Sequence, residues 1–204
     1  MKLKICGVNI NLSYPLAAGV TLLLVCDTTG TVMCGLCASV MHELGHISAM
    51  KFFGTRITDI RLSVFDIGIT DISKSRRSIT AEIIIILSGI FVNLVLFLLS
   101  YMLYNESRFY IFRYFALANL TLGLFNALPV ETLDGCEALS LILRRYFSEK
   151  AVYIITLVLS LAVIVPLGYL SVKALLNSVY NFTLLFAVLY LTGAVVFRIM
   201  SPEK

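Results

Sequence analysis

The feature that most constrains this chain is a pair of histidines inside an apolar segment. Residues His42 to His46 read His-Glu-Leu-Gly-His and lie within the largely apolar stretch 31–53. On a helix, residues four apart share one face, so both imidazoles could bind the same metal ion. Glu43 points elsewhere on the helix and could accept a proton from an attacking water. Ionisable groups at membrane depth are costly and are usually functional.

A bare His-Glu-x-x-His sequence also arises by chance in long chains, so the surroundings decide its meaning. The chain has two histidines, and both are in the motif. The motif lies in a long apolar run, and acidic residues downstream could supply a third ligand. Catalytic zinc usually takes three protein ligands and keeps one position open. We therefore expect one zinc ion per chain, bound by His42 and His46, with Glu43 as general base for peptide hydrolysis within the bilayer.

The composition predicts a membrane protein. Of the 204 residues, 59% are hydrophobic and 14% are charged, against roughly 45–50% and 25% in typical soluble domains. Six apolar runs are candidate spans: 14–26, 31–53, 79–104, 109–128, 151–170 and 182–198. We expect an α-helical polytopic membrane protein with about six transmembrane helices, in which residues 1–204 form a single transmembrane metalloprotease domain.

The positive charges predict the orientation of these spans. With the N-terminus inside, thirteen of the sixteen Lys and Arg residues fall on the cytoplasmic side. The other three are Arg108, Arg113 and Lys173. The positive-inside rule then predicts a multi-pass protein of the cell membrane with both termini in the cytoplasm. The net charge of +4 is explained by this topology, so we expect the lipid bilayer and no nucleic acid as a partner.

Period-two alternation predicts short β-strands at the cytoplasmic face. Apolar and polar residues alternate within 57–72, with a turn expected near Phe65 and Asp66, and a further short strand is expected before the first span. The strands after the second span would offer an unpaired edge. An extended substrate could add to that edge through main-chain hydrogen bonds.

Asp134 is the best-placed third ligand on local chemistry, and two interpretations of it stay open. Pro129 ends the fourth apolar helix, and Gly135 lets backbone approach closely. The helix breaks within the membrane, near the depth expected for the metal, where irregular backbone must line protein or a water-filled cavity. Alternatively, Asp134 caps an amphipathic helix over 135–147. Glu82 and Glu131 are the next candidate ligands.

Two asparagines in the apolar runs are further candidates. Asn126 could donate a hydrogen bond to the oxyanion that forms during amide hydrolysis, which makes it a candidate substrate-binding residue. It could also hydrogen-bond to a neighbouring helix. For Asn93 we expect this second role, in packing or in hydrogen bonding between helices.

Taken together, these motifs resemble those of the site-2 protease family of intramembrane zinc metalloproteases. The matching elements are His42-Glu-Leu-Gly-His46, Gly89-x-x-x-Asn93, and Asn126-x-x-Pro129 followed by Asp134-Gly135. The resemblance covers most of the chain, about residues 1–200. It implies that His42, His46 and Asp134 bind zinc. It also implies that Glu43 is the general base.

The short layout is most similar to the sporulation-type subgroup, which processes a membrane-associated pro-sigma factor. The resemblance implies a membrane protein or membrane-associated substrate, such as a pro-sigma factor or an anti-sigma factor. We expect the chain to lack the PDZ and CBS domains of many relatives, and Cys136 stands where a second glycine is frequent. A membrane metal transporter would need more ion sites than two histidines supply. A catalytically silent binding protein would not need Glu43.

Overall fold

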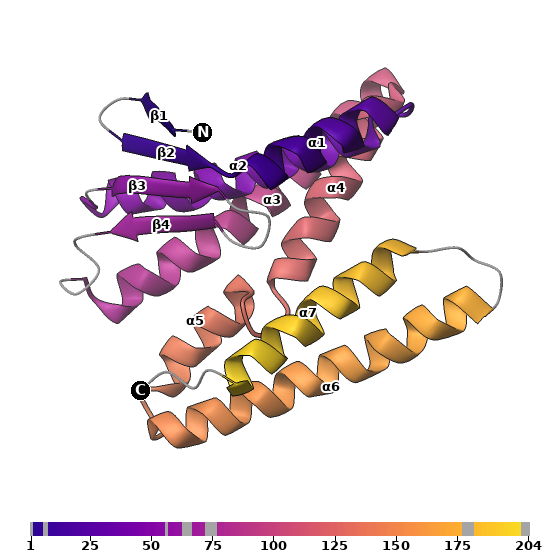
Figure 1. Ribbon diagram of the computed structural model, residues 1–204. Helices are drawn as coiled ribbons and strands as arrows, with labels where there is room; N and C mark the ends of the chain where they lie inside the picture. The colour runs from indigo at the N-terminus through magenta and orange to yellow at the C-terminus, as the bar shows by residue number, and fades with distance from the viewer. Residues whose placement is uncertain are drawn as a thin grey trace. The chain divides into compact units, whose positions relative to one another are not determined.

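The computed structural model describes residues 2–5, 8–55, 57–62, 67–71, 77–176 and 182–200. Contacts divide the chain into two compact units, Met1–Gly123 and Leu124–Lys204. Figure 1 shows their elements. The described residues are mostly helical, as the composition predicted. A single domain over the whole chain stays a prediction.

The first unit contains a four-stranded sheet in the order β1-β2-β3-β4 (Figure 1). Its strands are β1 (Lys2–Ile5), β2 (Val8–Leu12), β3 (Ile57–Leu62) and β4 (Ile67–Asp71). The outer pairs are antiparallel, whereas β2 and β3 run parallel. Because β3 pairs with both β2 and β4, only β4 of the two strands within 57–72 lies at an edge of the described sheet. The expected turn near Phe65 and Asp66 lies outside the described residues.

Four helices accompany the sheet. They are α1 (Tyr14–Cys26), α2 (Thr31–Phe52), α3 (Ile79–Ser107) and α4 (Tyr110–Asn126). The Asp27 carboxylate accepts hydrogen bonds from the backbone N–H groups of Gly30 and Met33, at 2.9 and 3.1 Å, and so satisfies donors at the start of α2. Gly30 has a φ of 76°, a left-handed conformation that glycine adopts without steric cost. Ser78 caps α3 in the usual way, by accepting from the Ala81 N–H.

Helices α2 and α3 pack against each other along the histidine-bearing part of α2. A Cβ atom at Gly45 would lie 2.9 Å from the Ser88 carbonyl oxygen and 3.1 Å from the Gly89 Cα. Only a residue without a side chain lets the two backbones come this close. The crossing therefore places the buried face of α2 directly on α3.

The second unit is built from α5 (Asp134–Leu143), α6 (Glu149–Leu176) and α7 (Phe182–Met200). Helices α6 and α7 lie side by side (Figure 1). The core of the unit consists of buried aliphatic residues: Val130, Leu133, Ile164, Val188, Leu191 and Val195. Since Val130 and Leu133 precede α5, the segment before that helix is anchored in the core.

Helices occupy all six ranges that the apolar runs predicted, with α6 continuing past Pro166 to Leu176 and α5 ending at Leu143. Within the described part, α3 and α6 are long and apolar enough to cross a membrane. The helices α1 and α7 contain shorter apolar segments, Ala17–Cys26 and Leu184–Met200. The total of six spans stays a prediction.

Candidate metal centre

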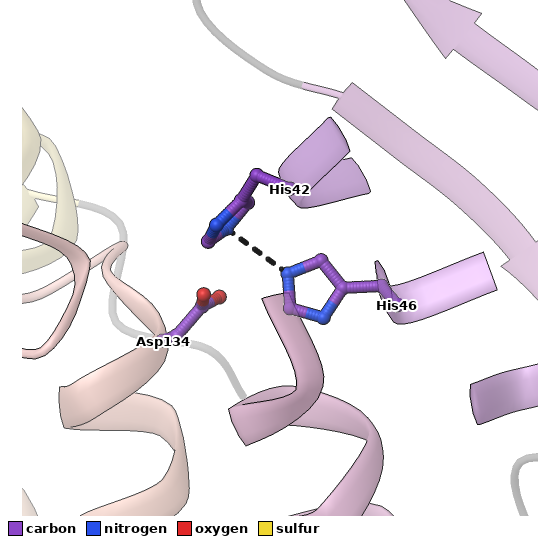
Figure 2. A group of neighbouring side chains, drawn as sticks. All are labelled: His42, His46 and Asp134. Carbon is purple, nitrogen blue, oxygen red and sulfur yellow. Dashed lines mark hydrogen bonds between the residues drawn. The ribbon is translucent and has the colours of Figure 1, made fainter. Parts of the chain in front are cut away.

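His42 and His46 lie on one face of α2, as their spacing predicted. Both are largely buried, with 5% and 9% of their surface exposed. Their Nε2 atoms are 3.1 Å apart (Figure 2), and the two rings meet edge to face. Both imidazoles therefore direct their Nε2 atom toward the same point.

The contact of the other His46 nitrogen determines which tautomer the ring adopts. His46 Nδ1 lies 2.8 Å from the backbone carbonyl oxygen of Ile85 on α3. A carbonyl oxygen can only accept, so Nδ1 carries the hydrogen. In the neutral ring, Nε2 of His46 then presents a lone pair toward His42.

Hydrogen bonds through two asparagine side chains hold His42 in the same tautomer. Asn119 Nδ2 donates to the Phe115 carbonyl oxygen at 2.8 Å, so Asn119 Oδ1 is an acceptor. Asn93 Nδ2 donates to that oxygen at 2.9 Å and to the Ala38 carbonyl oxygen at 3.3 Å. Asn93 Oδ1 is therefore the atom facing His42 Nδ1, at 2.5 Å, and it accepts from it. Nε2 of His42 is left with a lone pair, as in His46.

Two lone pairs that face each other at this distance need an electrophile between them, either a proton or a metal ion. Neutral imidazole nitrogens are common zinc ligands, and ligating histidines usually donate their second N–H to an oxygen of the protein. Gly89 leaves the room for this arrangement, because a Cβ there would lie 2.5 Å from His46 Nε2 and 2.8 Å from His42 Cε1. The histidine pair thus fits a metal ion such as zinc.

Asn93 does more than the packing role expected for it. It hydrogen-bonds to α2 and α4, as expected, but its side-chain oxygen also orients His42. Asn119 was not predicted from the sequence at all, although it is fully buried and sets the amide orientation of Asn93. The signal available was the one that marked Asn93, an amide in an otherwise apolar helix.

In the second unit, Asp134 is the first residue of α5. The N-cap of this helix is Leu133, which has an extended backbone. The interpretation of Asp134 as the N-cap is therefore wrong, since Asp134 is already helical. A Cβ at Gly135 would lie 2.6 Å from the Ala127 carbonyl carbon and 2.8 Å from the Leu128 oxygen. This confirms the close backbone approach expected of Gly135.

Glu131, the alternative ligand three residues earlier, takes part in an ion pair. Its carboxylate accepts from the guanidinium of Arg198 on α7. A carboxylate held in an ion pair must give up that pairing before it can bind a metal ion. The ion pair with Arg198 therefore weakens the case for Glu131 as a ligand.

Figure 2 draws the side chains of His42, His46 and Asp134. Because Asp134 belongs to the second unit, the histidine pair carries the fit to a metal ion and Asp134 is a proposed ligand. Glu43 is half-buried on α2, and Asn126 is half-buried at the end of α4. Their catalytic roles stay predictions.

No protein-family model matches the sequence. The chain is similar to the Stage IV sporulation protein FB of Bacillus subtilis, with 27% identity over 139 residues. That match covers 67% of this chain and 48% of the relative, so it spans about half the length of the curated protein. The fold is similar to the Site-2 Protease from Methanocaldococcus jannaschii, with a TM-score of 0.67 and 20% identity. The structural match covers 96% of this chain and 93% of the other.

These two similarities confirm the resemblance that the motifs indicated. The structural match shows a common fold, and the sequence match links part of this chain to a sporulation protein.

Proposed function

We propose that this protein is an intramembrane zinc endopeptidase that hydrolyses a peptide bond of a membrane-embedded or membrane-associated protein. The observation that carries the proposal is the pair of Nε2 atoms, 3.1 Å apart, in two histidines whose Nδ1 atoms both face acceptors on α3. This arrangement lies in a chain of high apolar content. The similarity in fold to a site-2 protease supports the same reaction class.

In this proposal His42, His46 and Asp134 bind one zinc ion per chain. Two neutral imidazoles and one carboxylate are a donor set typical of catalytic zinc. When bound, zinc supplies Lewis-acid chemistry that activates water and polarises the scissile carbonyl. The protein's own part is to hold the three donors in place and to fix the histidine tautomers through Asn93 and the Ile85 carbonyl.

Glu43 is the proposed general base. It follows His42 directly, so its side chain leaves α2 about 100° around the helix from that of His42. The Glu43 carboxylate takes a proton from water as the water oxygen attacks the scissile carbonyl carbon. The same carboxyl group then gives that proton to the amide nitrogen as the C–N bond breaks. Asn126 is proposed to donate a hydrogen bond to the carbonyl oxygen while it carries negative charge.

The membrane layout follows the charge pattern. We propose six membrane-spanning helices, α1, α2, α3, α4, α6 and α7, with both termini in the cytoplasm. Helix α2 ends at Phe52, six residues after His46, which places the site about 9 Å along the helix from its cytoplasmic end. Water would then reach the site from the cytoplasm. The proposed substrate is a membrane protein such as a pro-sigma factor or an anti-sigma factor.

The orientation can be tested by labelling with a membrane-impermeant thiol reagent, after the native cysteines are replaced. Ser107→Cys lies at the end of α3 and Ser148→Cys lies between α5 and α6. In intact cells we expect labelling at position 107 and not at 148. The opposite pattern would reverse the topology.

The function itself is tested with purified protein, a membrane substrate peptide and zinc at controlled concentration. His42→Ala, His46→Ala and Asp134→Ala should each lose bound zinc and cleavage together. Glu43→Gln should keep its zinc and lose cleavage, because an amide cannot accept the proton; base catalysis alone is worth about 10²–10⁴-fold. Glu106→Gln, on an exposed part of α3, is the matched control and should retain both properties.

The same set separates the competing functions. A metal transporter would move zinc across vesicles without cleaving peptide, and Glu43→Gln would not abolish the transport. A silent binding protein would hold zinc and substrate but release no product. Full zinc occupancy in Asp134→Ala would remove Asp134 from the ligand set, and substantial cleavage by Glu43→Gln would refute the mechanism.

A further inference from the structure

The segment between α4 and α5 carries an ion pair that the catalytic proposal does not use. The Glu131 carboxylate accepts from the Arg198 guanidinium, and both side chains are only about one quarter exposed, at 24% and 26%. The same guanidinium donates to Thr156 Oγ1 at 3.2 Å, and its central carbon lies 4.7 Å from the centre of the Tyr153 ring. Arg198 is thus held between the segment and α6 by a charge, a hydroxyl and an aromatic face.

The backbone around Glu131 is fixed as well. The Glu131 N–H donates to Ser160 Oγ on α6 at 3.1 Å. On either side of it, Val130 is fully buried and Leu133 is 6% exposed, both in the core formed with α6 and α7. The segment therefore has two apolar anchors, with one charged anchor between them.

These anchors surround a strained residue. Thr132 has a φ of 73°, in the left-handed region that β-branched residues rarely adopt. Such a conformation persists only where the surrounding structure holds it in place. Glu131 and Leu133 are its two chain neighbours, and Asp134 follows after one more peptide unit. The direction in which α5 starts, and with it the Asp134 side chain, thus depends on how firmly this turn is held.

We propose that Glu131 and Arg198 are positioning residues, which hold the turn so that Asp134 is presented to the metal. The inference rests on the proposed function, because it takes Asp134 as a zinc ligand. Neither side chain touches the reacting atoms. If one partner is removed, the other charge is left in a largely enclosed place without its counter-charge, and it moves toward water. The turn then loses its charged anchor while the two apolar anchors remain.

The test uses the full chain in detergent with Glu131→Gln, Arg198→Met, the two combined, and the charge swap Glu131→Arg with Arg198→Glu. Zinc affinity is measured by competition with a chelator, and kcat and KM are measured on a membrane substrate. Each single variant should weaken zinc binding about tenfold or more and lower kcat while leaving KM unchanged. The combined variant should be no worse than the poorer single one, and the charge swap should recover part of the affinity.

Arg198→Lys tests the geometry of the pair. Lysine keeps the charge but has no planar fork to bond Glu131 while it lies over an aromatic ring. Its zinc affinity should fall between those of the wild type and Arg198→Met. The matched control is Glu149→Gln, which removes an exposed ion pair with Arg144, 3.4 Å apart, at the other end of α5. That variant should bind zinc as the wild type does.

Wild-type zinc affinity and kcat in both Glu131→Gln and Arg198→Met would overturn the positioning role. If one single variant fails to fold, the charge swap is compared with the single variant that does fold. If the swap binds zinc as weakly as that variant, the positioning role is also overturned. If the wild type itself binds no zinc, the proposed function fails first. The two failures are therefore distinguishable.

Discussion

The histidines and the aspartate of the proposed metal centre are held in different ways. His42 and His46 lie in the middle of α2, and their outer nitrogens bond to α3, the next helix along the chain. Asp134 begins α5 directly after an irregular turn, which is held by contacts to α6 and α7. A regular helix spaces its side chains by its own backbone hydrogen bonds, whereas a turn is only as precise as its anchors.

This difference predicts different kinds of failure. Substitutions around the histidines should change metal binding and leave the helices intact, because α2 and α3 form without it. Substitutions that disturb the packing around Asp134 should affect folding and metal binding together, because the turn is part of the core of its unit. Each of the following variants tests this contrast.

Gly135→Ala should have the largest effect. A Cβ there would meet the backbone of Ala127 and Leu128, with contacts of 2.6 and 2.8 Å to the Ala127 carbon and the Leu128 oxygen. Backbone cannot move aside as a side chain can, so overpacking of about 1–3 kcal/mol or more is expected. Thermal unfolding should occur at lower temperature and bound zinc should be lost. Gly193→Ala on α7, where no described atom lies within 4 Å of the new methyl, is the control.

An unchanged unfolding temperature in Gly135→Ala would contradict the contrast. It would mean that the start of α5 can shift without disturbing the core, and that Asp134 is held less tightly than its surroundings imply.

Gly89→Ala should abolish or strongly weaken metal binding with a smaller effect on folding. Its methyl group would fall 2.5 Å from His46 Nε2 and 2.8 Å from His42 Cε1, and it would push both rings away from their acceptors. Loss of ligand orientation of this kind typically costs about 10–100-fold in metal affinity. Zinc competition and thermal unfolding should be measured together. Gly35→Ala on α2, with no described atom within 4 Å, should match the wild type in zinc affinity.

If Gly89→Ala unfolds as readily as Gly135→Ala, the contrast is wrong. The histidines would then depend on the folding of their surroundings as much as Asp134 does. Retained zinc affinity in Gly89→Ala would show that the rings can rotate and still bind the metal.

The same contrast explains what the sequence could predict. The histidine motif, the helix ranges and the strands follow from spacing and periodicity, which are local properties. The close backbone approach at Gly135 was predicted from its position beside Asp134 and after Pro129. The parallel pairing of β2 with β3 did not follow, because it joins residues as distant as Ile10 and Ile60.

The hydrogen-bond and ion-pair partners of the polar residues could not be predicted from the sequence either. Glu131 and Arg198 are 67 positions apart, and no local pattern connects them. Asn93 was noticed, but its bond to His42 depends on how α2 and α3 cross at Gly45. Such contacts depend on packing between elements, so a single sequence supplies the candidates without saying which of them meet.

Asn119→Leu should have a moderate effect, confined to the metal. Leucine cannot accept from Asn93 Nδ2, so the Asn93 amide loses the partner that fixes its orientation. His42 then loses its preference for donating through Nδ1, and we expect zinc affinity to fall about tenfold. Asn119→Asp should restore much of it, because a protonated acid can accept from Asn93 and donate to the Phe115 carbonyl. Asn105→Leu, at an exposed position of α3, is the control, and equal affinities in all three variants would dismiss the amide chain.

Thr132→Gly should have the smallest effect, and in the opposite direction. A left-handed conformation costs a non-glycine residue about 1–2 kcal/mol, whereas glycine adopts it freely but loses roughly 0.5–1 kcal/mol more backbone entropy on folding. The net result should be a small rise in unfolding temperature, with zinc affinity unchanged because Val130, Glu131 and Leu133 still anchor the turn. Thr121→Gly, at an exposed position of α4, should instead destabilise slightly, since glycine is unfavourable in a helix. Weaker zinc binding in Thr132→Gly would mean that the strained backbone, and not its anchors, directs Asp134.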